Sequence, residues 1–429
     1  MIEEMIHIIG AGPTGMSLAW ELQGAGHDVT IYDRKQSAGG SWWEPTVGQR
    51  DLHAHRILFD NAWVNARSLF AEMGMDWNAL FERHQDQVFG YMFKTLQFKD
   101  YLALLTLPFV ARHDLTLKDA LKGRLSPSGE NFMEHLPLVI DGVTWSTMSS
   151  LELVQSVNHV TFSSQWTQKV SGKVMCDQMQ RALERTGKVT FRFGATLEKL
   201  QFATKGGDNY VATFSDGKKL TDELLVLCVD HSPAAGLVGE NWGIDTAERI
   251  RELTYGCINL LLDYPEGAPT TIPDDLEVAS RTRWKLQPRV LSDDKTVSCV
   301  ICDLTEDILT SDPHALKMEV LNQLKLTPPT NVRVGWGSVW NGQRWTFQQS
   351  SGLSARVPFF GTCPKVALCG MMSERKTPYA SMEAAVEVAR RFSHENFGTR
   401  QPLDSLKISH VLVIVFIILL TSRYARIHR

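Results

Sequence analysis

The chain has 429 residues, enough for two or three domains, and its 43% hydrophobic and 21% charged residues are typical of a folded globular protein. Its formal net charge of −4 gives no reason to expect nucleic acid as a partner, because that partner requires a basic surface. The amino end carries no secretory apolar segment, and the chain contains no N-x-S/T sequon. The main body is therefore predicted to lie in the cytosol with reduced thiols.

The first segment with a clear signature covers residues 6–33. The apolar run MIHII suits a buried parallel strand and leads into the turn GAGPTG at residues 10–15. In such a turn the first glycine allows the tight bend, the second admits a diphosphate, and the third lets the following helix pack on the strand. A helix (TGMSLAWELQGAG) and a second strand ending in Asp33 follow, and that acid lies 23 residues after Gly10, where it can bind a ribose. The order of features predicts a βαβ unit that binds an ADP-containing dinucleotide, and the motif alone leaves NAD and FAD open.

The middle of the chain predicts a second packed region. Residues 63–164 are aromatic-rich with helical stretches, and residues 265–349 alternate strand-like patches with the helical PHALKMEVLNQLK. Cys299 and Cys302 lie in a β-branched apolar run, where a buried strand is favoured over a metal or dithiol site. Trp336, Trp340 and Trp345 are either walls of a substrate pocket or, as is more common, core residues.

Three further motifs carry a resemblance to a known family. Asp33 is followed by KQSAGGSWWEP, LEKL occupies residues 197–200, and CGMM with YASMEAAV occupies residues 369–386. Together with the glycine turn, these resemble the FAD-dependent amine oxidase superfamily, which includes flavin-containing amine oxidoreductases and phytoene desaturase-like enzymes. The resemblance covers about half of the chain. It implies bound FAD and hydride transfer from an amine or hydrophobic small-molecule substrate to flavin N5.

The resemblance also implies which residues contact the cofactor. The Met382 backbone would lie near the pyrimidine edge of the flavin, with a helix that begins near Met382 directing N–H groups at the ring. The implied cofactor-binding residues are Gly10, Gly12, Pro13, Thr14, Gly15, Asp33, Arg34, Gly39, Gly40, Ser41, Leu197, Gly370, Met371 and Met382.

The sequence also departs from the family pattern. Met371 replaces an expected acid, Ser381 replaces an aromatic residue, and the segment YGCINLLLDYPEG lacks the lysine that monoamine oxidase-like members place near N5. No cysteine lies in the family's covalent-attachment context, so FAD is expected to be noncovalent. The catalytic residues stay unknown, with His53, Arg56 and Tyr379 as candidates. No metal site is expected, because His53 and its neighbour His55 lack further ligands at suitable spacing.

The carboxyl end predicts a membrane anchor. Residues 411–420 form an unbroken apolar run, and the segment 406–424 is long enough to span a bilayer, with Lys407 and Arg423 at its edges. A buried terminal helix is the alternative, although such a helix normally shows a polar face. The predicted localisation is a single-pass C-terminal membrane anchor, with the main domain in the cytosol.

The predicted fold class is α/β, a Rossmann-like FAD-binding domain with an inserted α+β substrate domain and a C-terminal transmembrane helix. Two other functions remain open: a UDP-galactopyranose mutase-like non-redox flavoenzyme, for which arginines 281, 283 and 289 could bind a sugar diphosphate, and a flavin-binding membrane protein without turnover. The expected boundaries are residues 1–62, 165–240 and 355–400 for the FAD-binding domain, 63–164 and 241–354 for the substrate domain, and 406–424 for the anchor.

Overall fold

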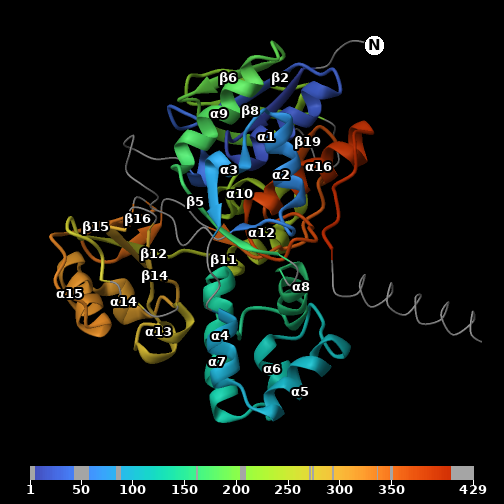
Figure 1. Cartoon of the computed structure of the whole chain (residues 1–429). Coiled ribbons are helices and arrows are strands. Elements are labelled where there is room, and N and C mark those ends of the chain that lie inside the picture. The colour runs from blue at the N-terminus through green and yellow to red at the C-terminus, as the bar shows by residue number, and fades with distance from the viewer. Residues whose placement is uncertain are drawn as a thin grey trace, which may run out of the picture.

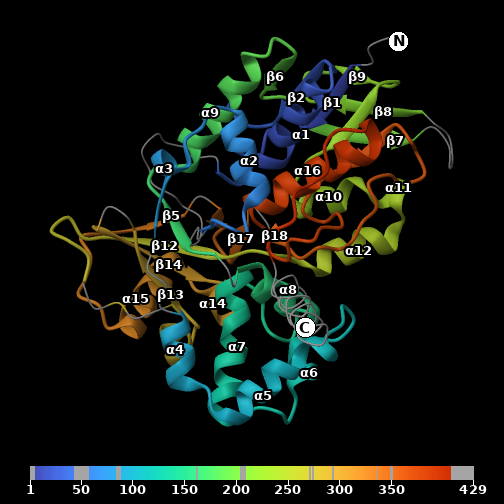
Figure 2. The same cartoon turned by 45° about the vertical axis from the view of Figure 1, so that its right-hand side comes forward.

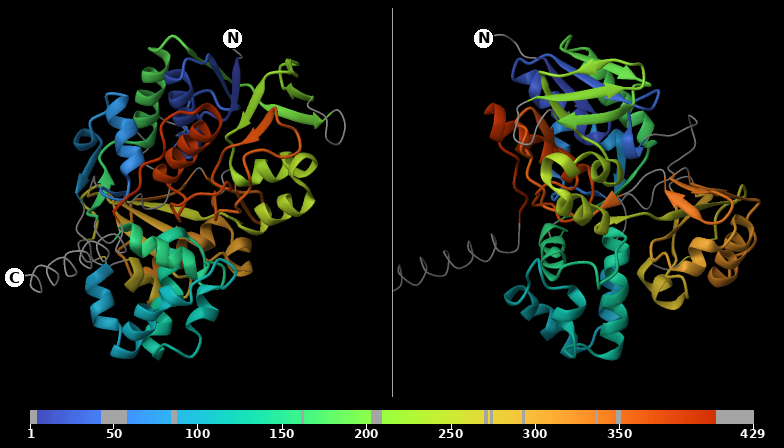
Figure 3. Two further views of the ribbon diagram at one scale, coloured as in Figure 1. Left: turned by 90° about the vertical axis from the view of Figure 1, so that its right-hand side faces the viewer. Right: turned by 180° about the vertical axis from the view of Figure 1, so that it is seen from behind.

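The computed structural model of the chain is shown in Figure 1. It describes residues 5–42, 58–83, 88–160, 163–202, 209–269, 272, 275–291, 294–335, 337–347 and 351–406. The half of the molecule that contains the predicted dinucleotide-binding turn, called the cofactor half after that prediction, surrounds a parallel sheet. A helical lobe (α4–α8) lies against one end of it, and a smaller sheet lobe (β12–β17) lies beside both, as the two views of Figure 3 show.

A five-stranded parallel sheet forms the centre of the cofactor half, with the strand order β19-β10-β1-β2-β6. Its strands come from three stretches that are far apart in the sequence. β1 pairs with β2 on one side and with β10 on the other, both in parallel, and every residue of β1 and β2 is buried. Strands that are buried on both faces are typical of a parallel sheet covered by other elements on each side. The strands are β1 (Ile6–Ile9), β2 (Val29–Asp33), β6 (Val189–Phe193), β10 (Leu224–Leu227) and β19 (Val366–Leu368).

The two faces of this sheet pack against different elements. Ile6 and Ile8 point to one face and pack with α1 (Pro13–Gly24), α2 (Val64–Glu72), α9 (Gly172–Glu184) and α16 (Met382–Phe397). Ile9 and Tyr32 point to the other face. That face is covered by the antiparallel strands β7 (Leu197–Phe202), β8 (Tyr210–Phe214) and β9 (Lys219–Leu220), and by helices α10 (His231–Leu237), α11 (Gly239–Trp242) and α12 (Ile244–Glu252).

A buried ion-pair network holds α16 against α1 and α2. Arg390 of α16 is fully buried, and its Nε donates to Glu21 Oε1 of α1 at 2.9 Å. Its guanidinium also donates to Asn65 Oδ1 at 3.2 Å and to Glu72 Oε1 at 3.0 Å, both on α2. Near the start of α16, Glu383 Oε1 accepts the Asn65 Nδ2–H at 2.7 Å. These bonds place the amino end of α16 close to the carboxyl edge of the parallel sheet.

The helical lobe consists of α4 (Val88–Thr95), α5 (Phe98–Thr106), the 3₁₀ turn η2 (Leu107–Phe109), α6 (Leu117–Leu121), α7 (Pro127–Asp141) and α8 (Ser150–Val160). Ser126 caps α7 by accepting the Gly129 N–H at 3.1 Å, and the buried Asp100 carboxylate fixes Ser126 through its N–H and Oγ. At its other end α7 stops at Asp141, because Gly142 takes a left-handed conformation with φ 72°. Figure 2 shows α7 running from the base of this lobe towards the cofactor half.

The sheet lobe is built on an antiparallel sheet with the order β13-β14-β12-β15. Its strands and helices are β12 (Ile258–Asp263), β13 (Gln287–Val290), β14 (Thr296–Ile301), β15 (Asn331–Val334), α13 (Asp275–Arg281), α14 (Glu306–Thr310) and α15 (Pro313–Leu324), with the pair β16 (Ser338–Trp340) and β17 (Trp345–Phe347) beside them. The remaining elements are η1 (Gly40–Trp42), β3 (Leu58–Phe59), α3 (Trp77–Leu80), β4 (Phe81–Arg83), β5 (Gln165–Gln168), β11 (Thr254–Tyr255) and β18 (Ser351–Gly352). Cys299 is buried in β14, as the apolar run predicts.

The predicted localisation requires a correction. Within the described part of the chain, no helix is long and apolar enough to cross a membrane. The longest of these helices, α16, has 16 residues and carries the charged side chains of Glu383, Glu387, Arg390 and Arg391, whereas a spanning helix needs about 20 predominantly apolar residues. The segment 406–424 lies, apart from Leu406, outside the described residues. The structure therefore gives no support for a single-pass anchor.

Candidate functional site

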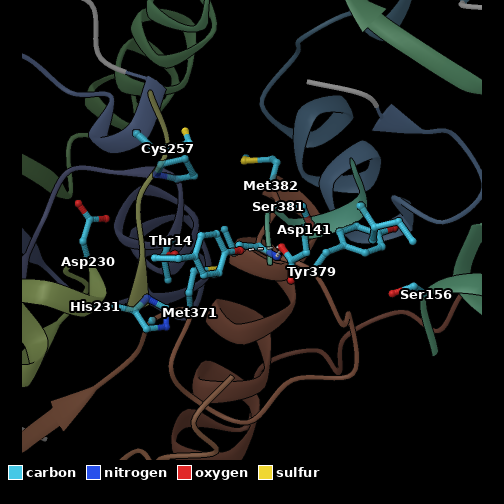
Figure 4. Close-up of a pocket in the computed structure, with 18 of the residues that line it drawn as sticks. Thr14, Asp141, Ser156, Asp230, His231, Cys257, Met371, Tyr379, Ser381 and Met382 are labelled. Carbon is cyan, nitrogen blue, oxygen red and sulfur yellow. Dashed lines mark hydrogen bonds between the residues drawn. The ribbon is translucent and has the colours of Figure 1, made fainter. Parts of the chain in front are cut away.

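A cavity of about 1200 Å³ runs from the carboxyl edge of the parallel sheet into the helical lobe. Gly10, Gly12 and Thr14 of the glycine turn line one end of it, and side chains of α5, α7 and α8 line the other. Figure 4 shows the region between these ends, with Thr14 and Met371 on one side of Asp141 and with Ser381 and Met382 close to it. A volume of this size exceeds that of an ordinary ligand pocket and has room for a large cofactor and a substrate.

The glycine turn leaves no space for side chains. A Cβ on Gly10 (φ +110°) would meet Cys228 O at 2.2 Å, and a Cβ on Gly15 would meet Gly10 O at 2.0 Å. The second glycine loop packs against the first, because a Cβ on Gly40 (φ +52°) would lie 2.7 Å from Gly12 Cα. Bare backbone from two loops thus lines the same wall, next to the amino end of α1. This is the geometry that brings N–H groups close to a diphosphate.

Acids and cations from neighbouring strands surround this wall. Asp33 Oδ2 accepts the Ala11 N–H at 2.7 Å, so the carboxylate holds the turn in place while it lines the cavity. Lys35 Nζ donates to Gly40 O at 3.0 Å, and burial lowers the pKa of Lys35 to about 8, against the raising effect of Asp33 and Asp230. Burial also raises the pKa of Asp230 to about 6, against the charges of Lys35 and Arg34. Opposite charges are therefore held together in a site of low polarity.

The amino end of α16 closes the far side of the cofactor region. Ser381 caps the helix by accepting the Ala384 N–H at 3.2 Å, and Met382 is the first helical residue. The helix begins at the predicted residue. Its first-turn N–H groups have no partner within the helix, so this end favours negative charge. Ser381 and Met382 both line the cavity, together with Gly370 and Met371 from the loop after β19.

The structure brings most of the predicted cofactor residues to one surface. Gly15 and Gly39 do not line the cavity: Gly15 packs beneath the turn, and the Gly39 N–H donates to Ala11 O at 2.9 Å. Of the catalytic candidates, Tyr379 lines the cavity, while His53 and Arg56 lie outside the described residues. The predicted residues that line the cavity are Gly10, Gly12, Pro13, Thr14, Asp33, Arg34, Gly40, Ser41, Leu197, Gly370, Met371 and Met382.

A polar cluster that the sequence did not reveal lies where the cofactor region meets the helical lobe. Asp141 Oδ1 accepts the Tyr255 hydroxyl at 2.8 Å and the Ala380 N–H at 3.3 Å. Its Oδ2 is shielded from solvent and has no hydrogen-bond partner among the described residues. Burial raises the pKa of Asp141 to about 7, against the opposing charge of Arg375 and the hydrogen bond from Tyr255. The cluster offers a carboxyl group that can change protonation state near neutral pH.

Comparisons with known proteins agree with this architecture. Residues 8–69 match a family described as an NAD(P)-binding Rossmann-like domain. The solved structure of putrescine oxidase bound to putrescine aligns with a TM-score of 0.66 and 14% identity over 92% of this chain and 99% of that one. The CLA-producing fatty acid isomerase of P. acnes aligns with a TM-score of 0.64 and 11% identity over 92% of this chain and 99% of that one. The chain shares the fold of these solved structures.

The curated relatives match only a part of this chain. YgfK of Escherichia coli strain K12, whose name assigns it provisionally to the oxidoreductases, is 32% identical over 87 residues, which are 20% of this chain and 8% of YgfK. The chain therefore covers less than a tenth of that relative's length. The predicted resemblance to the amine oxidase superfamily is confirmed at the level of the fold. At 14% identity or less, the solved structures show the fold alone.

Two other titratable residues that line the cavity, Tyr379 and His231, stay neutral near physiological pH. The Tyr379 hydroxyl and His159 Nδ1 lie 2.8 Å apart, and burial, with the nearby Glu383 charge, raises the pKa of the Tyr379 phenol. Tyr379 therefore stays a neutral phenol at physiological pH. His231 Nε2 lies 3.1 Å from Leu353 O, and burial lowers its pKa to about 4, so the ring stays neutral.

The residues predicted for other sites lie elsewhere in the fold. Arg281 pairs with Glu277 on α13, and Arg283 is 65% exposed. Neither lines the cavity. Trp345 is a buried core residue of the sheet lobe, and the partly buried Trp340 packs against that core. Trp336 lies outside the described residues.

Proposed function

We propose that the protein is an FAD-dependent oxidoreductase that removes a hydride from a carbon of an amine or hydrophobic substrate. One observation carries the proposal: a single cavity joins a glycine-lined dinucleotide cradle to an apolar chamber, and the amino end of α16 lies at the junction. The matches to putrescine oxidase and to a fatty acid isomerase are consistent with small substrates that carry apolar chains.

The described residues fit FAD in noncovalent form. The contact between Gly12 and Gly40 leaves backbone alone facing the diphosphate position, and Asp33 is placed to accept a ribose hydroxyl. Two cavity thiols lie in the substrate region, and burial raises the pKa of Cys257 to about 11 and that of Cys302 well above its usual range. Both stay protonated near neutral pH, which supports a flavin without a thioether link, since the thiolate is the nucleophile.

The cofactor and the chain have separate parts in the proposed reaction. FAD, when bound, supplies the two-electron acceptor. The amino end of α16 directs N–H groups at the region where negative charge develops, and Met371 and Met382 provide apolar contact. The Asp141 carboxylate can hold a substrate proton, and the apolar walls of the helical lobe exclude water from the reacting atoms.

Anaerobic reduction of the flavin tests the proposal. The full chain, purified with FAD, is mixed anaerobically with a panel of primary and secondary amines and apolar alcohols, and the flavin absorbance is followed. Bleaching by at least one class, with saturation in substrate concentration, supports an oxidoreductase. A flavin that dithionite reduces but that no member of the panel reduces, together with specific binding of a UDP-sugar, would favour the mutase-like alternative. The arginines predicted for that alternative, Arg281, Arg283 and Arg289, do not line the cavity.

A further inference from the structure

The part of the cavity in the helical lobe is shaped for an apolar chain. Its walls come from α5, η2, α7 and α8, and they include Leu104, Leu107, Phe132, Leu136, Ile140 and Val154. Three other lining side chains are also exposed: Leu105 by 69%, Phe109 by 87% and Val157 by 46%. The cavity therefore reaches solvent between α5, η2 and α8 through an apolar mouth, which we define by Leu105, Phe109 and Val157.

The inner end of this chamber has the opposite character, because it ends at Asp141. This carboxyl group is held by the Tyr255 hydroxyl and the Ala380 N–H, while its Oδ2 has no partner among the described residues. Ala380 directly precedes Ser381 and Met382 at the start of α16, so the acid lies next to the expected flavin position. Figure 4 shows Asp141 beside Tyr379 and Ser381.

The charged groups of the chamber favour an ammonium over a carboxylate as the polar end of the substrate. Among the described lining residues, the cations are Arg34 and Lys35, and both belong to the cofactor region. Arg375 influences Asp141 through its charge, but it does not line the cavity, and its NH1 and NH2 donate to Thr377 O and Gly352 O. A substrate with a carboxylate head would place two like charges together without a described lining cation beside them. An ammonium head would instead meet an acceptor that lacks a donor.

We propose that the substrate is a long-chain alkyl amine whose amino group binds Asp141 and whose chain lies between α5, α7 and α8 with its tail towards the apolar mouth. This inference rests on the proposed function, because it assigns a substrate to the cavity of that oxidoreductase. The two ends of the chamber contact different parts of the ligand. The apolar walls increase the affinity as the alkyl chain lengthens, and Asp141 favours an amino group over a carboxylate.

Binding, measured without turnover, tests this inference. The full chain is titrated calorimetrically with dodecylamine, butylamine and dodecanoate, each below its micelle concentration. Dodecylamine is expected to bind at least about a thousandfold more tightly than butylamine, since up to eight further methylenes leave water. It is also expected to bind about tenfold or more tightly than dodecanoate, because only the amine donates to Asp141. Equal binding of the amine and the carboxylate by the wild-type protein would overturn the proposal.

Two variants test the contact of the amino group and the contact of the alkyl chain separately. Asp141→Asn keeps an acceptor for Tyr255 but removes the charge, so it is expected to lose the preference for dodecylamine over dodecanoate. Val157→Trp places bulk at the apolar mouth and is expected to weaken dodecylamine but not butylamine. Val174→Trp is the matched control, since Val174 is 39% exposed on α9 and does not line the cavity. An unchanged preference in Asp141→Asn, or equal effects of the two tryptophans, would contradict the assignment.

This test is independent of the proposed redox chemistry. Failure of every amine to bleach the flavin would count against the oxidoreductase, while the calorimetric preferences would still be measurable. Conversely, bleaching by short amines together with no gain in affinity for dodecylamine would leave the oxidoreductase in place and overturn the long-chain assignment.

Discussion

Replacement of Arg390 by methionine tests the contact that positions α16 over the cavity. The guanidinium has no solvent exposure and makes charged hydrogen bonds to Glu21 at 2.9 Å and Glu72 at 3.0 Å. Breaking a buried pair from one side costs about 3–5 kcal/mol, because the remaining charge stays buried. Here Glu21 keeps a second partner, since Arg400 Nε donates to its Oε2 at 3.1 Å. We therefore expect a loss at the lower end, about 3 kcal/mol in the free energy of unfolding.

Urea denaturation of Arg390→Met and of a surface control, Arg391→Met, measures this loss of stability. Arg391 is the next residue on α16, is 30% exposed, and pairs with Glu395 and Glu374 near the surface. Arg391→Met should cost about 1 kcal/mol or less, as surface ion pairs do. Arg390→Met should also weaken flavin binding, because the amino end of α16 loses its support. If Arg390→Met lowers the free energy of unfolding no more than Arg391→Met does, the buried ion-pair network does not hold α16 in place.

Three other predictions follow from the site. Gly15→Ala should abolish flavin binding, because its Cβ would lie 2.0 Å from a backbone oxygen. Gly24→Ala is the control and should bind flavin normally, since a Cβ there meets no atom within 4 Å. A Gly15→Ala protein that purifies with a flavin spectrum would contradict the prediction. Burial raises the pKa of Asp141 to about 7, so the folded protein keeps a proton that the unfolded chain loses near pH 4. The free energy of unfolding, compared with that of Asp141→Asn, should therefore fall as pH rises from 4 to 7. A difference between the two proteins that stays constant over this pH range in denaturation experiments would contradict the prediction. Burial raises the pKa of the Cys257 and Cys302 thiols, so both should resist alkylation by iodoacetamide at pH 8 in the native protein and react in urea. Equally fast alkylation in the native and unfolded states would contradict the raised pKa.

Local sequence was sufficient for the cofactor half because its requirements are local. Gly15 packs on Gly10 O within one strand-turn-helix unit, and Asp33 bonds the Ala11 N–H from the next strand. Gly10 and Gly12 meet Cys228 and Gly40 from outside this unit, but the glycine spacing along the chain already indicates the turn. The helix at the carboxyl end begins at Met382, where the family resemblance predicts it. In such elements the spacing along the chain determines the contact in space.

The polar cluster between the cofactor half and the helical lobe could not be predicted in the same way, because distant segments assemble it. Asp141 meets Tyr255 across 114 residues and Ala380 across 239 residues. In the sequence, Asp141 followed by Gly142 is an ordinary helix end, and nothing local indicates that the acid points into a cavity. The pairing of His159 with Tyr379 spans 220 residues and is equally invisible. The prediction of a membrane anchor shows a related limit, since apolar composition alone does not establish a spanning helix.

The central claim is that the cavity binds FAD noncovalently, and the most direct test is an absorption spectrum of the purified full chain before and after acid precipitation. We predict a flavin spectrum that moves completely into the supernatant on precipitation. Flavin retained in the pellet would contradict noncovalent binding. A folded, colourless protein that takes up no added FAD but binds NAD would contradict the claim itself.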